Sequence, residues 1–188
     1  MNHTTRWPGT ICVIDTETTG LLDDPDARVI ELAGVIIDAT GREAAVLQTM
    51  VKPAILTDAG LDVMRRFNGI RPEWLENAPT ERDALRALSA WLYAYNYPSV
   101  TSYNLEFDSG VVYRMDGARE VSFNWGPDCV KLAATDLLDP GGKWYSLREA
   151  IRDLDLTDHA NSHRALDDAR AAAAVLHQIR VRTNGDHR

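Results

Sequence analysis

Cysteine is nearly absent from this sequence of 188 residues, which contains only Cys12 and Cys129. Two isolated cysteines fit neither a disulfide framework nor a zinc site. Each lies in or beside an apolar segment, so we expect both to be small core side chains. The fold must then rest on a hydrophobic core, and a chain of this length is long enough to bury one.

Long hydrophobic runs are also missing. No apolar stretch approaches the roughly 20 residues that a helix needs to cross a bilayer. Residues 1–9 contain no apolar segment of the signal-peptide kind. We therefore expect a cytoplasmic protein without a membrane partner. Its length predicts a single domain over residues 1–188, with a core at about 10–182 and flexible tails.

Positive charge is the third scarcity. The chain has 20 lysines and arginines against 28 aspartates and glutamates, a formal net charge of −8. A protein that coats nucleic acid through a broad basic surface would carry the opposite sign. The balance does not exclude an enzyme whose acids hold metal ions, because bound cations reverse the local charge.

What the sequence does contain is a short apolar run that ends in two acids, Ile-Cys-Val-Ile-Asp-Thr-Glu-Thr-Thr-Gly-Leu at 11–21. The β-branched residues predict a buried strand. Positions i and i+2 of a strand share a face, which would place Asp15 beside Glu17. Adjacent carboxylates repel unless a proton or a cation lies between them, and Mg²⁺ or Mn²⁺ would serve. The alternative is an ordinary polar turn after a strand.

The rest of the chain predicts a mixed sheet flanked by helices, an α/β or α+β domain. We expect further strands at 29–38, 45–51 and 99–102, and a short strand followed by a helix in the segment 128–138. The strand within 11–21 and those at 29–38 and 45–51 would form an antiparallel meander that opens the domain. We expect helices at 57–69, 72–75, 84–95, 146–154 and 162–182, and one that carries Asp108 in its first turns.

Several side chains in these elements have two interpretations. Glu31 could face the acidic site, but a solvent-facing or hydrogen-bonded strand position is favoured because a strand has two faces. Met64 could line the site, although core packing is favoured. The aromatic residues of 91–97 are expected to pack rather than bind a ligand. His177 is expected on a helix surface, and His3, His159 and His187 lack any catalytic context.

Acids in structured contexts recur in two later segments, as Asp108 and as Asp168 beside Asp167. The last segment also carries His163. Five residues along a helix rotate by about 140°, so His163 and Asp168 could not share a helical face. His163 is therefore expected in the loop or cap before the helix, from which it can lean over a site that includes Asp168.

Three segments together resemble the motifs of the DEDDh 3′–5′ exonucleases, the DnaQ-like family. They are D-T-E-T-T-G-L at 15–21, N-L-E-F-D at 104–108 and H-R-A-L-D-D at 163–168. Their order and spacing fit the family, and the likeness covers roughly residues 10–180. Tyr103 departs from the pattern, because many members have histidine before the asparagine. The resemblance implies a ribonuclease H-like fold, with a mixed β-sheet flanked by helices.

The resemblance also implies roles for individual residues. The carboxylates that would hold two Mg²⁺ or Mn²⁺ ions are Asp15, Glu17, Asp108 and Asp168. Asp167 is the rival of Asp168, and the motif spacing selects Asp168. His163 would be the general base. The residues expected at the 3′ end of the substrate are Thr18 through its backbone, Leu21, Asn104 and Phe107.

The expected activity is metal-dependent hydrolysis at 3′ ends of single-stranded DNA or RNA, with DNA slightly favoured, releasing nucleoside 5′-monophosphates by a two-metal mechanism. Family members work as homodimers or beside a polymerase, so either partner is expected. The alternative function is a non-catalytic nucleic-acid-binding or polymerase-associated module that keeps the fold.

Overall fold

The computed structural model describes residues 9–126, 128–156 and 163–185, so most of the two expected tails lies outside the described ranges. Its centre is a four-stranded sheet in the order β3-β2-β1-β4. The strands are β1 (Ile11–Thr18), β2 (Val29–Ile37), β3 (Glu43–Met50) and β4 (Ser99–Ser102). β1 pairs antiparallel with β2 and parallel with β4. The predicted meander and the mixed sheet are thus confirmed.

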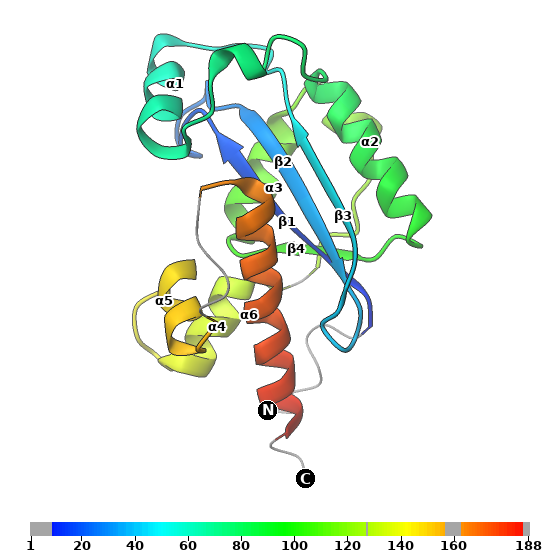
Figure 1. The fold of residues 1–188 in the computed structure, drawn as a ribbon, viewed down its shortest axis with the longest axis vertical. Helices are drawn as coiled ribbons and strands as arrows, with labels where there is room; N and C mark the ends of the chain where they lie inside the picture. Colours follow the sequence, from blue (N-terminus) through cyan, green and yellow to red (C-terminus); the bar gives the residue numbers. More distant parts are fainter. Residues whose placement is uncertain (1–8, 127, 157–162, 186–188) are drawn as a thin grey trace.

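Helices cover both faces of this sheet, because the side chains of β1 alternate between two cores. Ile11 and Val13 belong to the core that includes α6 (Ala165–Gly185), whereas Cys12 and Ile14 belong to the core with α2 (Glu81–Ala94) and α3 (Leu105–Arg114). Figure 1 shows α6 lying along one face, with α3 behind the sheet. The result is a layered α/β fold that buries β1 and β2 at its centre.

The remaining helical elements are short, and three of them, beginning at residues 58, 72 and 147, start within one residue of a predicted helix. They are α1 (Asp58–Val63), η1 (Met64–Asn68), η2 (Pro72–Trp74), η3 (Ala118–Glu120), α4 (Val130–Leu138) and α5 (Leu147–Asp153). Thr57 accepts the Gly60 N–H ahead of α1, and Ser146 forms a capping box with Glu149 ahead of α5. Among the described residues, no helix combines the length and apolar character that a membrane crossing requires.

Two local predictions on β-structure and aromatic packing are wrong. No strand opens the segment 128–138; the Trp125 backbone bridges Val100 instead, and the chain then enters α4 directly. Tyr93 and Tyr97 do not pack into the core but form an edge-to-face pair at the surface, 69 % and 47 % exposed. Trp91 of the same segment does pack, against the core between α2 and the sheet.

The prediction for His177 is also wrong, because its ring is partly buried against the turn between β2 and β3. A Cβ atom at Gly41 would come within 2.3 Å of the His177 ring, and Gly41 has a φ of +82°. Only glycine satisfies both conditions. His3, His159 and His187 lie outside the described residues.

Candidate active site

β1 carries two of the predicted site carboxylates, Asp15 and Glu17, near its C-terminal end. They continue the series of Ile11 and Val13 and so lie on the face that α6 covers. Both are half-buried. The pairing register with β2 shifts between Glu17 and Thr18. Such an irregularity bends a strand and re-aims its side chains, so the acids lie where the strand leaves the regular sheet.

Asp108 reaches the same place from α3, on the other side of β1. Thr16, which alternation points toward α3, donates from Oγ1 to Asp108 Oδ1 at 2.8 Å. Asp108 is only 3 % exposed, and its charge acts on Asp15. The second motif is thereby tied to the first by a hydrogen bond between residues far apart in the chain.

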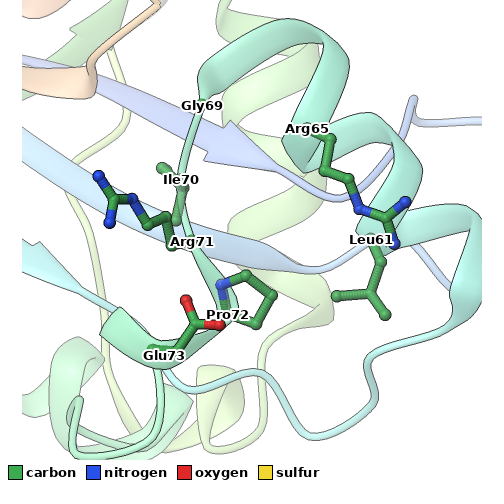
Figure 2. Close-up of a pocket in the computed structure, with 7 residues that line it drawn as sticks. All are labelled: Leu61, Arg65, Gly69, Ile70, Arg71, Pro72 and Glu73. Carbon is green, nitrogen blue, oxygen red and sulfur yellow. The ribbon is translucent and has the colours of Figure 1, made fainter.

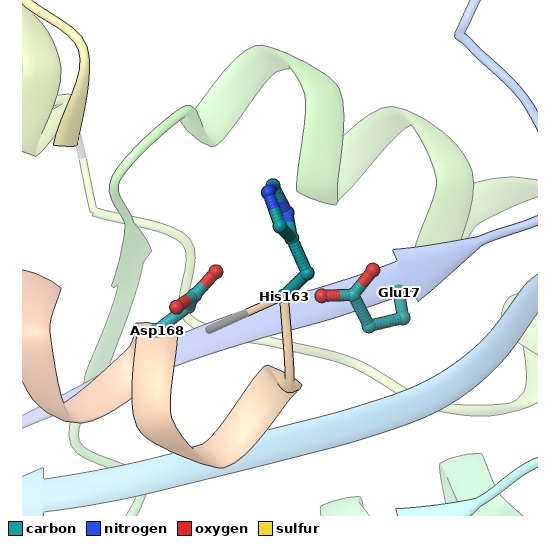
Figure 3. Close-up of side chains that lie close together, drawn as sticks. All are labelled: Glu17, His163 and Asp168. Carbon is teal, nitrogen blue, oxygen red and sulfur yellow. The ribbon is translucent and has the colours of Figure 1, made fainter. Parts of the chain in front are cut away.

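The third motif arrives at the beginning of α6. His163 precedes the helix, as predicted, with a φ of +54° in the left-handed region. One ligand atom each from Glu17, His163 and Asp168 lies within 4.8 Å of the others. Figure 3 shows Glu17 extending from β1 and Asp168 from α6, with His163 between the two elements. Asp168 is buried and Asp167 is exposed, so the geometry favours Asp168 over its neighbour.

Burial and mutual repulsion raise the pKa values of these acids. Burial first, then the charges of Asp108 and Asp168, hold the pKa of Asp15 well above its usual range. Burial and the charge of Asp168 raise the pKa of Glu17 to about 7, although hydrogen bonding from Asn68 opposes the rise. Burial raises the pKa of Asp108 to about 6, against the hydrogen bond from Thr16. The cluster holds protons strongly wherever no other cation compensates its charge.

The carboxylates of this cluster are suited to bind a divalent cation. Among the described residues, no N–H or O–H group donates a hydrogen bond to the Asp15 carboxylate. Carboxylate oxygens are the ligands that Mg²⁺ and Mn²⁺ prefer, and four of them would offset two divalent charges. A histidine within reach adds a base or a further ligand. The geometry is therefore that of an acidic metal site rather than of a polar turn.

Glu31 is the neighbour that sequence reasoning left open, and it takes the hydrogen-bonded position. It is fully buried, opposite Glu17 on β2. Its carboxylate accepts two hydrogen bonds from Arg164, at 2.8 and 3.1 Å, and one from the Ala165 backbone N–H at 3.3 Å. Gln48 donates a fourth at 2.7 Å. Glu31 thus holds the residues that directly follow His163.

The predicted substrate-binding residues belong to the elements that carry the acids, or lie just beyond them. Leu21 is 69 % exposed just beyond β1, and the backbone of Thr18 lies beside Glu17. Asn104 stands at the N-cap of α3, and Phe107 on that helix packs against the core behind the site. These positions agree with the expected roles, which stay predictions. Met64 is buried in a small core with Ile30, as favoured.

Lys131 was not singled out from the sequence, yet it fixes the orientation of Asn104. Lys131 Nζ donates to Asn104 Oδ1 at 2.7 Å. An ammonium group can only donate, so the amide oxygen must face Lys131 and the Nδ2 group must point away from it. The lysine also lies over the Trp144 ring, 4.5 Å from its centroid. No short-range pattern relates residue 131 to residue 104, so only the folded chain reveals the contact.

Comparison with known proteins bears on the same residues. Residues 12–176, most of the chain, match the exonuclease family RNase_T. The uncharacterized exonuclease CP81 of Escherichia phage 186 is 29% identical over 175 residues, in an alignment that covers 87% of this chain and 84% of the phage protein. The matched range includes all three motifs.

Solved structures share the fold. The nuclease domain of 3'hExo, a DEDDh family member bound to rAMP, has a TM-score of 0.73 at 17% identity, covering 95% of this chain and 94% of that one. S. pombe Pop2p in its Mg²⁺- and Mn²⁺-bound form has a TM-score of 0.67 at 13% identity, covering 94% and 84%. The predicted ribonuclease H-like fold is thereby confirmed. The chain belongs to the RNase_T exonuclease family.

Proposed function

We propose that this chain is a 3′–5′ exonuclease that releases nucleoside 5′-monophosphates from the 3′ ends of single-stranded nucleic acid, with DNA slightly favoured over RNA. One observation carries the proposal: acids from β1, α3 and α6 converge with His163 at the C-terminal end of β1. A complete set of acids together with the histidine disfavours the alternative, a nucleic-acid-binding module without catalysis.

The carboxylates that would hold two Mg²⁺ or Mn²⁺ ions are Asp15, Glu17, Asp108 and Asp168. The bound ions would activate a water molecule and stabilise the charge that develops on the phosphate and the leaving oxygen. His163 is exposed and adjacent to Glu17 and Asp168, so its imidazole can accept the proton of the attacking water. Its position outside α6 leaves the ring free to reach over the acids.

The 3′ terminal nucleotide would be held by groups at the rim of the acids. Leu21 offers an exposed apolar surface to the terminal base, and the Thr18 backbone, next to Glu17 on β1, would contact the same nucleotide. Asn104, oriented by Lys131, presents its Nδ2 donor away from the lysine, where it can meet a phosphate or hydroxyl oxygen. Phe107 completes the pocket from α3.

The test is a time course with 5′-labelled single-stranded DNA and RNA of one sequence, in Mg²⁺, Mn²⁺ or EDTA. We expect a ladder that shortens from the 3′ end only when a divalent ion is present, with the DNA degraded faster. Chromatography of the products should show nucleoside 5′-monophosphates. Products that appear from the 5′ end, or cleavage that persists in EDTA, would contradict the proposal.

The matched controls lie next to each other on α6. Asp168→Asn should abolish the ladder, whereas Asp167→Asn should leave it unchanged, because Asp167 is exposed outside the cluster. If the wild-type protein binds the oligonucleotide but never shortens it, the binding-module alternative replaces the proposal.

A further inference from the structure

The segment Met64–Trp74, between α1 and α2, differs in charge from the rest of the molecule. In a chain with a net charge of −8 it contains Arg65, Arg66 and Arg71 against one acid, Glu73. It also exposes an indole, since Trp74 is 42 % exposed. A local excess of guanidinium groups in an acidic protein favours contact with a polyanion.

This segment is anchored to the active site. Asn68 is 8 % exposed, and its Nδ2 donates to the Thr18 carbonyl oxygen at 3.3 Å, one residue beyond Glu17. Its Oδ1 accepts the Ile70 N–H, and the Ile70 side chain packs in the small core with Ile30. The segment therefore has a fixed position beside the end of β1.

Trp74 connects the segment to the third motif. The guanidinium carbon of Arg71 lies 5.4 Å from the centroid of the Trp74 ring, and that of Arg164 lies 5.9 Å from it. Arg164 adjoins His163 and is held from inside by Glu31. We call these three residues, Arg71, Trp74 and Arg164, the guanidinium–indole stack. Through Arg164 it adjoins His163 in the chain.

Arg71 is the member of the stack whose charge is not compensated. Glu31 offsets Arg164, and Asp62 pairs with Arg65 at 3.1 Å. Within the described ranges, no carboxylate lies within 4.0 Å of the Arg71 guanidinium. Contact with an aromatic ring leaves guanidinium N–H groups available, and their fork matches two phosphate oxygens. Arg71 is thus positioned to bind a phosphate.

A shallow hollow lies next to Arg71. It has a volume of about 500 Å³ and is lined by Leu61, Arg65, Gly69, Ile70, Arg71, Pro72 and Glu73. In Figure 2 Arg71 and Arg65 extend to opposite sides of the backbone of residues 69–72. Gly69, with a φ of +63°, allows the chain to turn there without a side chain.

We propose that the guanidinium–indole stack binds an internal phosphodiester of the single-stranded substrate, on the 5′ side of the nucleotide being removed. The inference rests on the proposed function and extends it, because only a polymer has such a phosphate near this surface. Trp74 and the Arg164–Glu31 pair hold Arg71 in place, and Arg71 supplies the charge.

Two substrates separate this contact from catalysis. The p-nitrophenyl ester of thymidine 5′-monophosphate reaches only the active site, whereas a thymidylate decamer also reaches the stack. Arg71→Ala should raise KM for the decamer about tenfold, the loss of a hydrogen bond to a charged group, with kcat unchanged. KM for the ester should stay at the wild-type value. Trp74→Ala should raise KM for the decamer less.

The matched control is Arg182→Ala, which removes an exposed guanidinium on α6. Residue 182 follows Arg164 by 18 positions, which is about 27 Å at the helical rise. It should change neither KM. Arg71 is exposed, so we expect its variant to keep the wild-type melting temperature. An Arg71→Ala protein that matches Arg182→Ala on the decamer, or that weakens both substrates equally, overturns the proposal.

Binding without metal gives an independent result. In EDTA, fluorescence anisotropy of a labelled decamer against salt should give a slope that is smaller by about 0.7 in Arg71→Ala, one phosphate contact on a single strand. An unchanged slope would contradict the assignment of the stack as a phosphate site, whether or not the wild-type protein hydrolyses either substrate. Failure of the wild-type protein to hydrolyse both substrates would refute the proposed function. An equal Arg71 effect on blunt duplex DNA would overturn the single-strand assignment.

Discussion

Two sets of buried or half-buried acids in this molecule differ in how many hydrogen-bond donors reach their carboxylates. Glu31 and Glu81 are both nearly inaccessible, and each has its own donors: Glu31 accepts hydrogen bonds from Arg164 and Gln48, and Glu81 accepts the backbone N–H groups of Ala54 and Asp116. The acids at the end of β1 have few or none. A buried carboxylate without donors is costly unless a cation joins it.

The comparison teaches which acids serve the fold and which serve chemistry. Donors that the chain itself supplies make Glu31 and Glu81 structural, because their charge is already compensated. Asp15 has no such donor among the described residues, and its pKa is raised by burial and by neighbouring carboxylates. Each prediction below changes one set of acids or its partners. Changes at the site acids should affect catalysis or metal binding, whereas changes at the structural acids should affect the free energy of unfolding.

The largest effect is expected from Asp15→Asn. This change should lower kcat by at least ~10³-fold, since a positioned metal ion contributes several kcal/mol to transition-state stabilisation. It should also raise the melting temperature of the metal-free protein at high pH, where the Asp15 carboxylate is otherwise charged and repelled by its neighbours. Kinetics on the thymidylate decamer and calorimetry in EDTA measure the two effects. Full activity in a folded Asp15→Asn protein would remove Asp15 from the mechanism.

The next largest effect is expected from His163, whose position is compatible with a general base or with a metal ligand. As a general base, His163→Ala should lower kcat by ~10²–10⁴-fold with Mn²⁺ affinity retained. Titration calorimetry with Mn²⁺ in the absence of substrate decides between the roles. Since His163 lies within 4.8 Å of Glu17 and Asp168, a parallel loss of Mn²⁺ affinity would identify it as a ligand.

How much of this site the sequence predicts depends on how far apart in the chain the contacting residues are. Alternation along β1 and the motif around Asp108 place the acids, because each motif lies within one local element. The bond from Arg164 to Glu31 joins residues 133 positions apart, and no local pattern specifies it. The same holds for Lys131 with Asn104 and for Arg71 with Trp74 and Arg164, where only tertiary packing brings the partners together.

Some local predictions failed for a related reason. The apolar residues after Pro127 suggest a strand, but hydrogen bonds to neighbouring segments replace one there. Thr101 donates to the Asp128 carbonyl oxygen, and the Lys131 N–H bonds to the Tyr103 carbonyl as α4 begins. Tertiary contacts of this kind override β-propensity.

The third prediction uses two ion pairs that differ in burial, one formed by Arg164 just before α6 and one by Arg170 within it. Arg164→Ala leaves the buried Glu31 with only Gln48 and the Ala165 N–H, and should lower the free energy of unfolding by about 2–3 kcal/mol. Arg170→Ala, which breaks an exposed pair with Glu43, should cost about 0–1 kcal/mol. Urea denaturation in EDTA measures both. Equal costs would show that Glu31 draws its stability from its other donors.

The smallest effect is a pH dependence that metal should reverse. In the metal-free protein, burial raises the pKa of Glu17 from 4.5 to about 7 and that of Asp108 from 3.8 to about 6. The folded chain then holds these protons more tightly than the unfolded chain. Their contribution to stability is therefore complete below about pH 4 and is lost as pH rises through about 6 and 7.

The melting temperature in EDTA should consequently fall between about pH 5 and pH 7.5. Mg²⁺ competes with the protons for the same oxygens, so the increase in melting temperature that it causes should be larger at pH 7.5 than at pH 5. Glu17→Gln isolates one of the two groups: its metal-free melting temperature should fall less over this range, because an amide does not titrate. Parallel curves for the wild type and Glu17→Gln would mean that the fall arises elsewhere in the molecule. A shallower curve for the variant would place the uncompensated charge at the end of β1, where the fold supplies carboxylates but few donors.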